Sequence, residues 1–172
     1  MAYIVRHEVP PVSTYIDIRL AAGLSRKSEQ AATIGLKNGL FSVVAYCDGV
    51  PVGIGRVIGD GGCFFEIVDI AVLPAHQKKG VGDLIMRALM GYVHENAPPT
   101  AYVSLMADHG TPKFYERYGF SRHRCRRRRG CSCGLRSARE AIPGDIQQYP
   151  AIRSRARLCR SRAAGRCSAR PS

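Results

Sequence analysis

The sequence predicts a mixed α/β domain over residues 1–120, followed by a basic tail over residues 121–172. Three observations predict this fold. Apolar residues recur at helical spacing in some segments and run or alternate as in strands in others. An Asp48-Gly49 pair joins two segments rich in β-formers. A glycine-containing loop then joins an apolar strand to an amphipathic helix, which is typical of α/β proteins.

The first elements are expected to be a short strand and two helices. Residues 3–9 contain β-formers, and two prolines end this strand. Residues 12–22 show helical spacing, and Gly23 follows them as a helix-ending glycine would. Ser28 can cap a second helix that continues to residue 36. The expected apolar positions of the first helix are Val12, Tyr15, Ile16 and Leu20.

The remaining elements are a hairpin, a strand, a long helix, another strand and a short helix. They are expected at residues 41–60, 63–74, 81–97, 101–107 and 111–120. The strand after the hairpin is nearly all apolar, as a strand covered on both faces would be. The short last helix has Thr111 as its expected N-cap and Gly119 where the helix ends.

The net charge of +13 lies entirely in the tail. Residues 1–120 contain 11 basic and 11 acidic side chains, whereas residues 121–172 contain 15 arginines and 2 acids. No stretch is long and apolar enough to cross a membrane, and the start of the chain lacks the pattern of a signal peptide. A cytoplasmic location is therefore expected, with a nuclear one if the arginine-rich tail is genuine.

The loop after the apolar strand, HQKKGVG, is the segment most suggestive of chemistry. Gly80 and Gly82 would let an anion approach the backbone, and the helix N-terminus that follows favours negative charge. The loop has neither the Walker A spacing nor the G-x-G-x-x-G dinucleotide pattern. From the residues alone, phosphate binding and a simple tight turn remain comparable readings.

Three motifs in the right order resemble the GCN5-related N-acetyltransferase (GNAT) superfamily. HQKKGVG is similar to the family's Q/R-x-x-G-x-G/A loop, with Gln77, Gly80 and Gly82 at the motif positions. DIAVLP resembles the strand that enters this loop, and FYERYGF resembles the family's late helix and its Gly-Phe end. The resemblance covers most of residues 1–120. It implies a GNAT-like, mostly antiparallel sheet with flanking helices and one splayed parallel strand pair.

The resemblance also implies a reaction. Acetyl-CoA would lie between the splayed strands DIAV and YVSLM, and a primary amine of a small molecule or peptide would attack its thioester directly. No metal is expected. The cofactor-binding residues implied are Ile70, Ala71, Val72, Gln77, Lys78, Lys79, Gly80, Val81, Gly82, Asp83 and Asp108. Asp108 stands where relatives often carry asparagine.

Tyr115 and Glu66 are the implied catalytic residues. Tyr115 aligns with the tyrosine that the family often uses to protonate the leaving thiolate, whose thiol pKa is about 8.5. Glu66 falls where one branch of the family carries a catalytic glutamate. Since Glu66 and Asp69 are three apart on a strand, they are expected on opposite faces, with only Glu66 on the face of Ile70 and Val72. Asp69 is the candidate lining the acceptor pocket, although a structural salt bridge fits either carboxylate.

The tail allows three readings. Its arginines could bind nucleic acid, which would then be a partner of the protein. His123 with Cys125, Cys131 and Cys133 could bind a metal, but the spacing fits poorly. The third reading is a shifted reading frame, since the tail has 15 arginines and no lysine. Read from one base earlier, the codons for GCSCG must encode three successive apolar residues, as a last strand of the family would.

The reading of the tail affects both the expected sheet and the expected function. If the tail is frame-shifted, the sheet lacks its regular last strands and the edge of YVSLM is exposed. The alternative function is a non-catalytic acyl-CoA-binding module or a nucleic-acid-binding module that works through its tail. The sequence leaves open whether the protein forms a homodimer.

Overall fold

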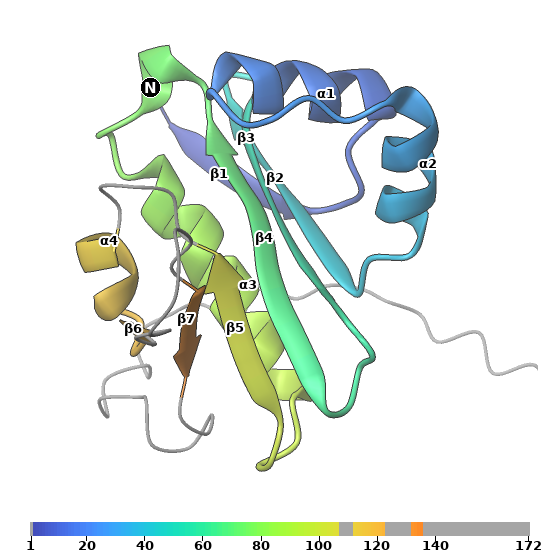
Figure 1. Cartoon of the computed structure of the whole chain (residues 1–172). Helices are drawn as coiled ribbons and strands as arrows, with labels where there is room; N and C mark the ends of the chain where they lie inside the picture. The colour runs from blue at the N-terminus through green and yellow to red at the C-terminus, as the bar shows by residue number, and fades with distance from the viewer. Residues whose placement is uncertain (1, 107–111, 123–131, 136–172) are drawn as a thin grey trace, which may run out of the picture.

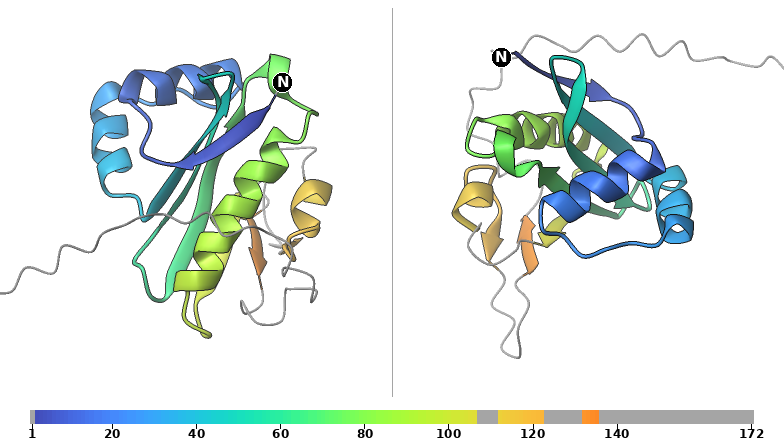
Figure 2. Two further views of the ribbon diagram at one scale, coloured as in Figure 1. Left: turned by 180° about the vertical axis from the view of Figure 1, so that it is seen from behind. Right: turned by 90° about the horizontal axis from the view of Figure 1, so that it is seen from above.

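The computed structural model describes residues 2–106, 112–122 and 132–135 (Figure 1). It contains one seven-stranded sheet in the order β1-β2-β3-β4-β5-β7-β6. Helices α1 and α2 lie against one face of the sheet and α3 lies against the other, as both views of Figure 2 show. The expected mixed α/β, mostly antiparallel architecture is confirmed.

Strand β1 (Tyr3–His7) pairs with β2, and helices α1 (Val12–Ala21) and α2 (Glu29–Lys37) follow β1 in the chain. The Ser28 side chain caps α2 by accepting a hydrogen bond from the Ala31 N–H at 3.2 Å, as predicted. The predicted core face of α1 needs one correction. Leu20 is 43% exposed; Tyr15 is buried as predicted, and Ile18 and Arg19 are buried beside it.

Strands β2 (Phe41–Cys47) and β3 (Val50–Gly59) form the predicted hairpin. Asp48 and Gly49 have φ angles of 49° and 83°, so both occupy the left-handed region that a tight two-residue turn requires. The turn thus matches the right-handed twist of its strands, and its position fixes which residues of β2 and β3 face each other.

Strand β4 (Phe64–Val72) pairs antiparallel with β3 and parallel with β5 (Tyr102–Met106). The parallel pairing runs only from Phe64 opposite Tyr102 to Ile67 opposite Leu105. Among the described residues the parallel pairing ends at Ile67, and β4 continues to Val72 paired with β3 only. One parallel pair in an otherwise antiparallel sheet is what the sequence resemblance implies.

A short 3-10 turn, Pro74–His76, leads from β4 toward α3 (Val81–Asn96), and α4 (Pro112–Glu116) follows β5. The main core lies between α3 and the sheet. Its fully buried side chains include Phe65, Ile67, Ile85, Met86, Leu89, Val103 and Leu105. The smaller core under α1 and α2 contains Tyr15, Ile18, Ala32, Leu36, Val44, Ile54 and Ala71.

The sheet does not end at β5, so the expectation of missing last strands is wrong. Strand β7 (Ser132–Leu135) pairs antiparallel with β5, and β6 (Ser121–Arg122) pairs with β7. The physical reason is that a strand ladder is made by backbone groups, so a segment without an apolar pattern can still cover an edge. Of the four tail residues considered for a metal site, His123, Cys125 and Cys131 lie outside the described residues.

Among the described residues, no helix is long and apolar enough to cross a bilayer. The described residues also contain no group of three or more His, Cys, Asp or Glu side chains that could hold a metal ion.

Gly55 of β3 allows α3 to approach the sheet closely. A Cβ at this position would lie 2.5 Å from Ile85 Cγ2 and 3.0 Å from Leu89 Cδ1. Gly55→Val should therefore lower the free energy of unfolding by about 1–3 kcal/mol through overpacking. Urea unfolding measures this. Gly91→Ala on α3 is the control, because nothing lies within 4 Å of its Cβ position. It should be neutral or stabilising, and equal losses for both variants would contradict the packing account.

His94 on α3 gives the fold a pH dependence. Burial lowers the pKa of its imidazole below the ordinary value of 6.5. Below that value the unfolded chain takes up the proton more readily than the folded one, so stability should fall as the pH drops from about 6.5 toward the folded pKa. His94→Gln should flatten the change in urea midpoint between about pH 7.5 and pH 5.5. An unchanged slope would remove His94 as its source.

Candidate active site

The strand β4 bulges at Asp69, just beyond the last residue paired with β5. On β3, Arg56 faces Val68 and Ile54 faces Ala71. Two residues of β4, Asp69 and Ile70, therefore stand opposite the single β3 residue Gly55. Asp69 has a φ of 59°, in the left-handed region. A bulge at this place turns the end of β4 away from its former register.

The bulge corrects the predicted faces of β4. An unbroken strand would put Glu66 with Ile70 and Val72, but the extra residue shifts the alternation by one. Glu66 and Asp69 therefore share the face covered by α1 and α2, where Asp69 contacts Tyr15. Ile70 and Val72 belong to the face covered by α3. The expectation that the two carboxylates point to opposite faces is wrong.

Asp69 is held by three side chains from α1 and β3. Its Oδ2 accepts a hydrogen bond from the Tyr15 hydroxyl at 2.8 Å, and its Oδ1 accepts one from Arg19 Nη1. Arg56 Nε lies 3.4 Å from Oδ2, within ion-pair distance. Both guanidinium groups also lie over the Tyr15 ring, 5.4 and 5.5 Å from its centroid. For Asp69, the structural salt bridge considered from the sequence is present.

Glu66 has a different environment. It stands opposite Ser104 of β5, one position before the parallel pairing ends. In the described residues, its carboxylate has no hydrogen bond or ion pair, and its side chain is partly exposed. Glu66 therefore stands beside the end of the β4–β5 pairing, whereas Asp69 is engaged by three side chains.

The loop between β4 and α3 presents a row of backbone donors. Lys78 and Gly80 have positive φ angles of 58° and 85°, and no side chain caps α3 at Gly80. Among the described residues, no hydrogen-bond partner occupies the N–H groups of residues 78–83. Gln77 ties this loop to the strand, since its Nε2 donates to the Val72 carbonyl at 3.0 Å.

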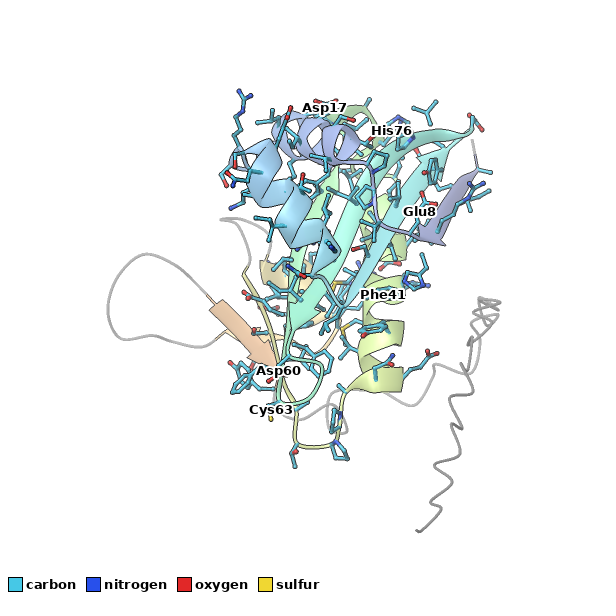
Figure 3. The ribbon with its side chains drawn as sticks, turned by 90° about the vertical axis from the view of Figure 1, so that its right-hand side faces the viewer. Glu8, Asp17, Phe41, Asp60, Cys63 and His76 are labelled. Carbon is cyan, nitrogen blue, oxygen red and sulfur yellow. The ribbon has the colours of Figure 1, made fainter. Side chains whose placement is uncertain are left out.

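His76, just before this loop, lies at the same end of the molecule as Asp17 of α1 (Figure 3). The β3–β4 turn, marked by Asp60 and Cys63, lies at the opposite end. The loop therefore sits at the end of the sheet toward which β4 runs after it leaves β5. The opening between β4 and β5 and the loop between β4 and α3 therefore lie in the same region of the molecule.

Asp83, in the first turn of α3, joins that helix to the segment after β5. Its carboxylate pairs with Arg87 at 2.6 Å and Arg117 at 3.1 Å, and it accepts a hydrogen bond from the Tyr118 hydroxyl. Burial and the hydrogen bond to Asp83 raise the pKa of Tyr118 above its usual range. The two arginines offset the negative charge of Asp83 at the start of α3.

Tyr115 lies in the main core with its side chain 9% exposed. Its neighbour Phe114 approaches the start of α3, since a Cβ at Gly82 would lie 3.8 Å from Phe114 Cζ. Helix α4, which carries the predicted proton donor Tyr115, therefore lies close to the predicted cofactor loop. Asp108, the remaining predicted cofactor residue, lies outside the described residues.

These features fit an acyl-CoA. The N–H groups of residues 78–83, which have no partner among the described residues, and the exposed Lys78 and Lys79 suit a pyrophosphate. The position of Gly80 is open, with nothing within 4 Å of where a Cβ would stand. On its β5 side the end of β4, from Ile70 to Val72, has no strand partner among the described residues, which leaves a backbone edge for an extended chain such as pantetheine.

Comparison with known proteins agrees with this geometry. Residues 38–122 match a family model described as an acetyltransferase (GNAT) domain. A protein of unknown function from meticillin-resistant Staphylococcus aureus, described as a probable acetyltransferase, is 40% identical in sequence. The alignment covers 74% of this chain and 96% of that protein, with a TM-score of 0.70. The chain belongs to the GNAT family of acetyltransferases.

More distant members of this fold are also similar. A GNAT-family protein from Xanthomonas campestris is 24% identical over 70% of this chain and 85% of that one, with a TM-score of 0.59. The ribosomal-protein-alanine N-acetyltransferase of Escherichia coli is 15% identical over 86% of this chain and 100% of its own, with a TM-score of 0.62. At these identities the likeness shows the GNAT fold alone. No curated protein sequence matches the chain.

The partners of Asp69 in this acetyltransferase were not predicted from the sequence. Arg56 stands in an otherwise apolar strand, VPVGIGRVIG, and an arginine there requires a buried partner. Arg19 follows Tyr15 by four residues, so the two share one face of α1. Both signals were present in the sequence, but only the fold shows that they converge on one carboxylate.

Proposed function

We propose that the protein transfers an acetyl group from acetyl-CoA to a primary amine, and that the domain of residues 1–120 carries this activity. The observation that carries the proposal is the meeting of three features at one end of the sheet: the opening between β4 and β5, the uncapped start of α3, and the loop of unpartnered N–H groups. Acetyl-CoA supplies an activated thioester, and the protein supplies its position.

The loop of residues 77–83 would hold the pyrophosphate, and the backbone of Ile70, Ala71 and Val72 would run beside the pantetheine arm. This places the thioester in the opening that begins after Ile67 and Leu105. A group on the α1 side and a group on the α3 side would act on the same bond at this opening.

Two proton transfers accompany the reaction. Glu66, on the α1 side, accepts the proton that the ammonium must lose before its nitrogen attacks the thioester carbonyl. The C–S bond breaks as the C–N bond forms. Tyr115, on the α3 side, donates a proton to the departing thiolate, and solvent returns it. Asp69 lines the acceptor side through its network with α1 rather than by accepting a proton.

The test is a pair of measurements on the full chain. Acetyl-CoA should raise the melting temperature, and free CoA thiol should appear when primary amines of different classes are added. Stabilisation without thiol release from any amine would favour the non-catalytic acyl-CoA-binding alternative. The absence of both would overturn the proposed function.

Gly80 offers a direct test of the loop. Gly80→Ala should weaken acetyl-CoA binding about tenfold or more, because its left-handed φ strains any side chain and shifts the N–H groups. Gly23→Ala is a matched control, with a φ of 84° and equally open surroundings. Both should lose about 1 kcal/mol of stability. Calorimetric titration should show weaker binding only for Gly80→Ala; equal affinities would remove the loop from the site.

A further inference from the structure

The network beneath α1 contains more positive than negative charge. Arg19 and Arg56 are 5% and 6% exposed, and Asp69 is the one carboxylate that the described residues place against them. A buried charge is costly unless it is paired and hydrogen-bonded. Two guanidinium groups and one carboxylate leave one positive charge in excess.

The donors of these arginines are also incompletely used. Arg19 donates to Asp69 and to the Ser25 carbonyl, but its buried Nε has no hydrogen-bond partner among the described residues. Arg56 Nε is buried as well and makes only the 3.4 Å ion-pair contact, without hydrogen-bond geometry. Unsatisfied buried donors on two adjacent cations call for an acceptor that carries negative charge.

Gly35 of α2 packs against the Arg56 guanidinium. Arg56 Nη1 lies beside Gly35, where a Cβ would be 3.8 Å away. Glycine inside a helix lowers helix stability, and Gly35 stands within α2. Because Gly35 has no side chain, no side-chain atoms of that residue cover the Arg56 guanidinium.

The network adjoins the proposed reaction centre. Arg56 pairs across strands with Val68, the first residue of β4 beyond the parallel pairing, and Asp69 is the next residue. Arg56 also lies on the same face of the sheet as Glu66, the proposed base. A ligand group held by Arg56 would therefore stand on the acceptor side of the opening between β4 and β5.

We propose that the acceptor is a primary amine that also carries a carboxylate, as an amino acid does. Arg56 binds the carboxylate through its planar guanidinium, and Arg19 contributes the second positive charge. Asp69 positions both arginines. This inference rests on the proposed function, since it names the acceptor class of that reaction.

The test compares acceptors that differ only in this charge. Glycine, β-alanine, γ-aminobutyrate and the standard amino acids are each assayed beside their carboxamides. For the best acceptor, kcat/KM should favour the acid over its amide roughly 10- to 100-fold. If thiol is released and no acid is preferred over its amide, the carboxylate inference is overturned while the proposed function stands.

Variants then locate the preference. Arg56→Lys should reduce the acid-to-amide ratio at least about tenfold, because lysine cannot make the bidentate contact. Gly35→Leu, which keeps every charge and covers Arg56, should reduce it too. Arg6→Lys is the control: Arg6 also lies over a tyrosine ring, at 5.0 Å, but on exposed β1. An acid preference that survives both Arg56→Lys and Gly35→Leu would overturn the assignment to Arg56.

Binding separates the two proposals if no amine is acetylated. The proposed function then fails, and calorimetric titration of the wild-type protein with the same acids and amides decides the carboxylate site. Acids that bind more tightly than their amides, with the difference lost in Gly35→Leu, would support it. Equal binding of acids and amides would contradict it.

Discussion

Tyr115→Phe is expected to lower kcat about 100-fold while leaving acetyl-CoA affinity within about twofold. The phenyl ring keeps nearly all of the packing that Tyr115 has in the main core, where it is 9% exposed. What is lost is the hydroxyl, and with it the proton for the departing thiolate. Steady-state thiol release and calorimetric titration with acetyl-CoA measure the two quantities separately.

Tyr118→Phe is the matched control, because it removes a hydroxyl three residues away. The Tyr118 hydroxyl donates to Asp83, so its loss should weaken the contact between α3 and this segment. A removed hydrogen bond to a charged group should cost about 1.5–3 kcal/mol of stability. Its kcat should fall much less than that of Tyr115→Phe. Wild-type turnover in Tyr115→Phe would exclude Tyr115 as the acid.

Asp69→Ala should lower the free energy of unfolding by about 3–5 kcal/mol, the largest stability loss expected in this protein. The carboxylate is the shared partner of Arg19 and Arg56, which are both buried. Without it, two guanidinium groups are left in a region of low polarity with no opposing charge. Urea unfolding at neutral pH measures the loss.

Two controls separate charge from backbone strain. Asp69→Asn keeps the shape and tolerates the left-handed φ, so it should lose most of the same stability if charge is the cause. Asp48→Ala changes another aspartate with a left-handed φ, 49°, on the exposed β2–β3 turn. It should cost only about 1 kcal/mol. An Asp69→Asn protein as stable as the wild type would contradict the ion-pair account.

The local chemistry of turns and caps was readable from the sequence. Asp48-Gly49, Ser28 and Gly119 each occupy the place predicted for them, because each responds to backbone requirements of its nearest neighbours. The loop from Gln77 to Gly82 was also predicted, since a glycine-rich turn between strand and helix has a recognisable spacing. These are features that a few consecutive residues determine.

The bulge at Asp69 could not be predicted in the same way. Its only local sign is an aspartate in an apolar strand, and the contacts that hold it come from Tyr15, Arg19 and Arg56. Because one extra residue reverses the faces of a strand, this single feature placed Glu66 on the other side of the sheet from that expected. The geometry of the site thus depends on contacts between residues far apart in the sequence, which the spacing of apolar residues does not predict.

The covering of β5 by β7 was likewise unforeseen. Ser132 and Cys133 lack the alternation of a strand, yet they pair with Met106 and Leu105. At these two positions the alternative reading frame would encode apolar residues. The frame-shift remains a prediction, and sequencing the source locus tests it: an early stop in the alternative frame, or no continuing apolar strand, would exclude it.

Hydrogen exchange with saturating acetyl-CoA tests the central claim most directly. If the cofactor lies in the opening of the sheet, exchange should slow at residues 78–83, whose N–H groups find no partner in the part of the chain that the structure describes, and along β4 at Ile70–Val72. The β3–β4 turn around Asp60, at the other end of the sheet, should be unaffected. Protection of that turn alone, or no protection at the loop despite measurable binding, would contradict this account.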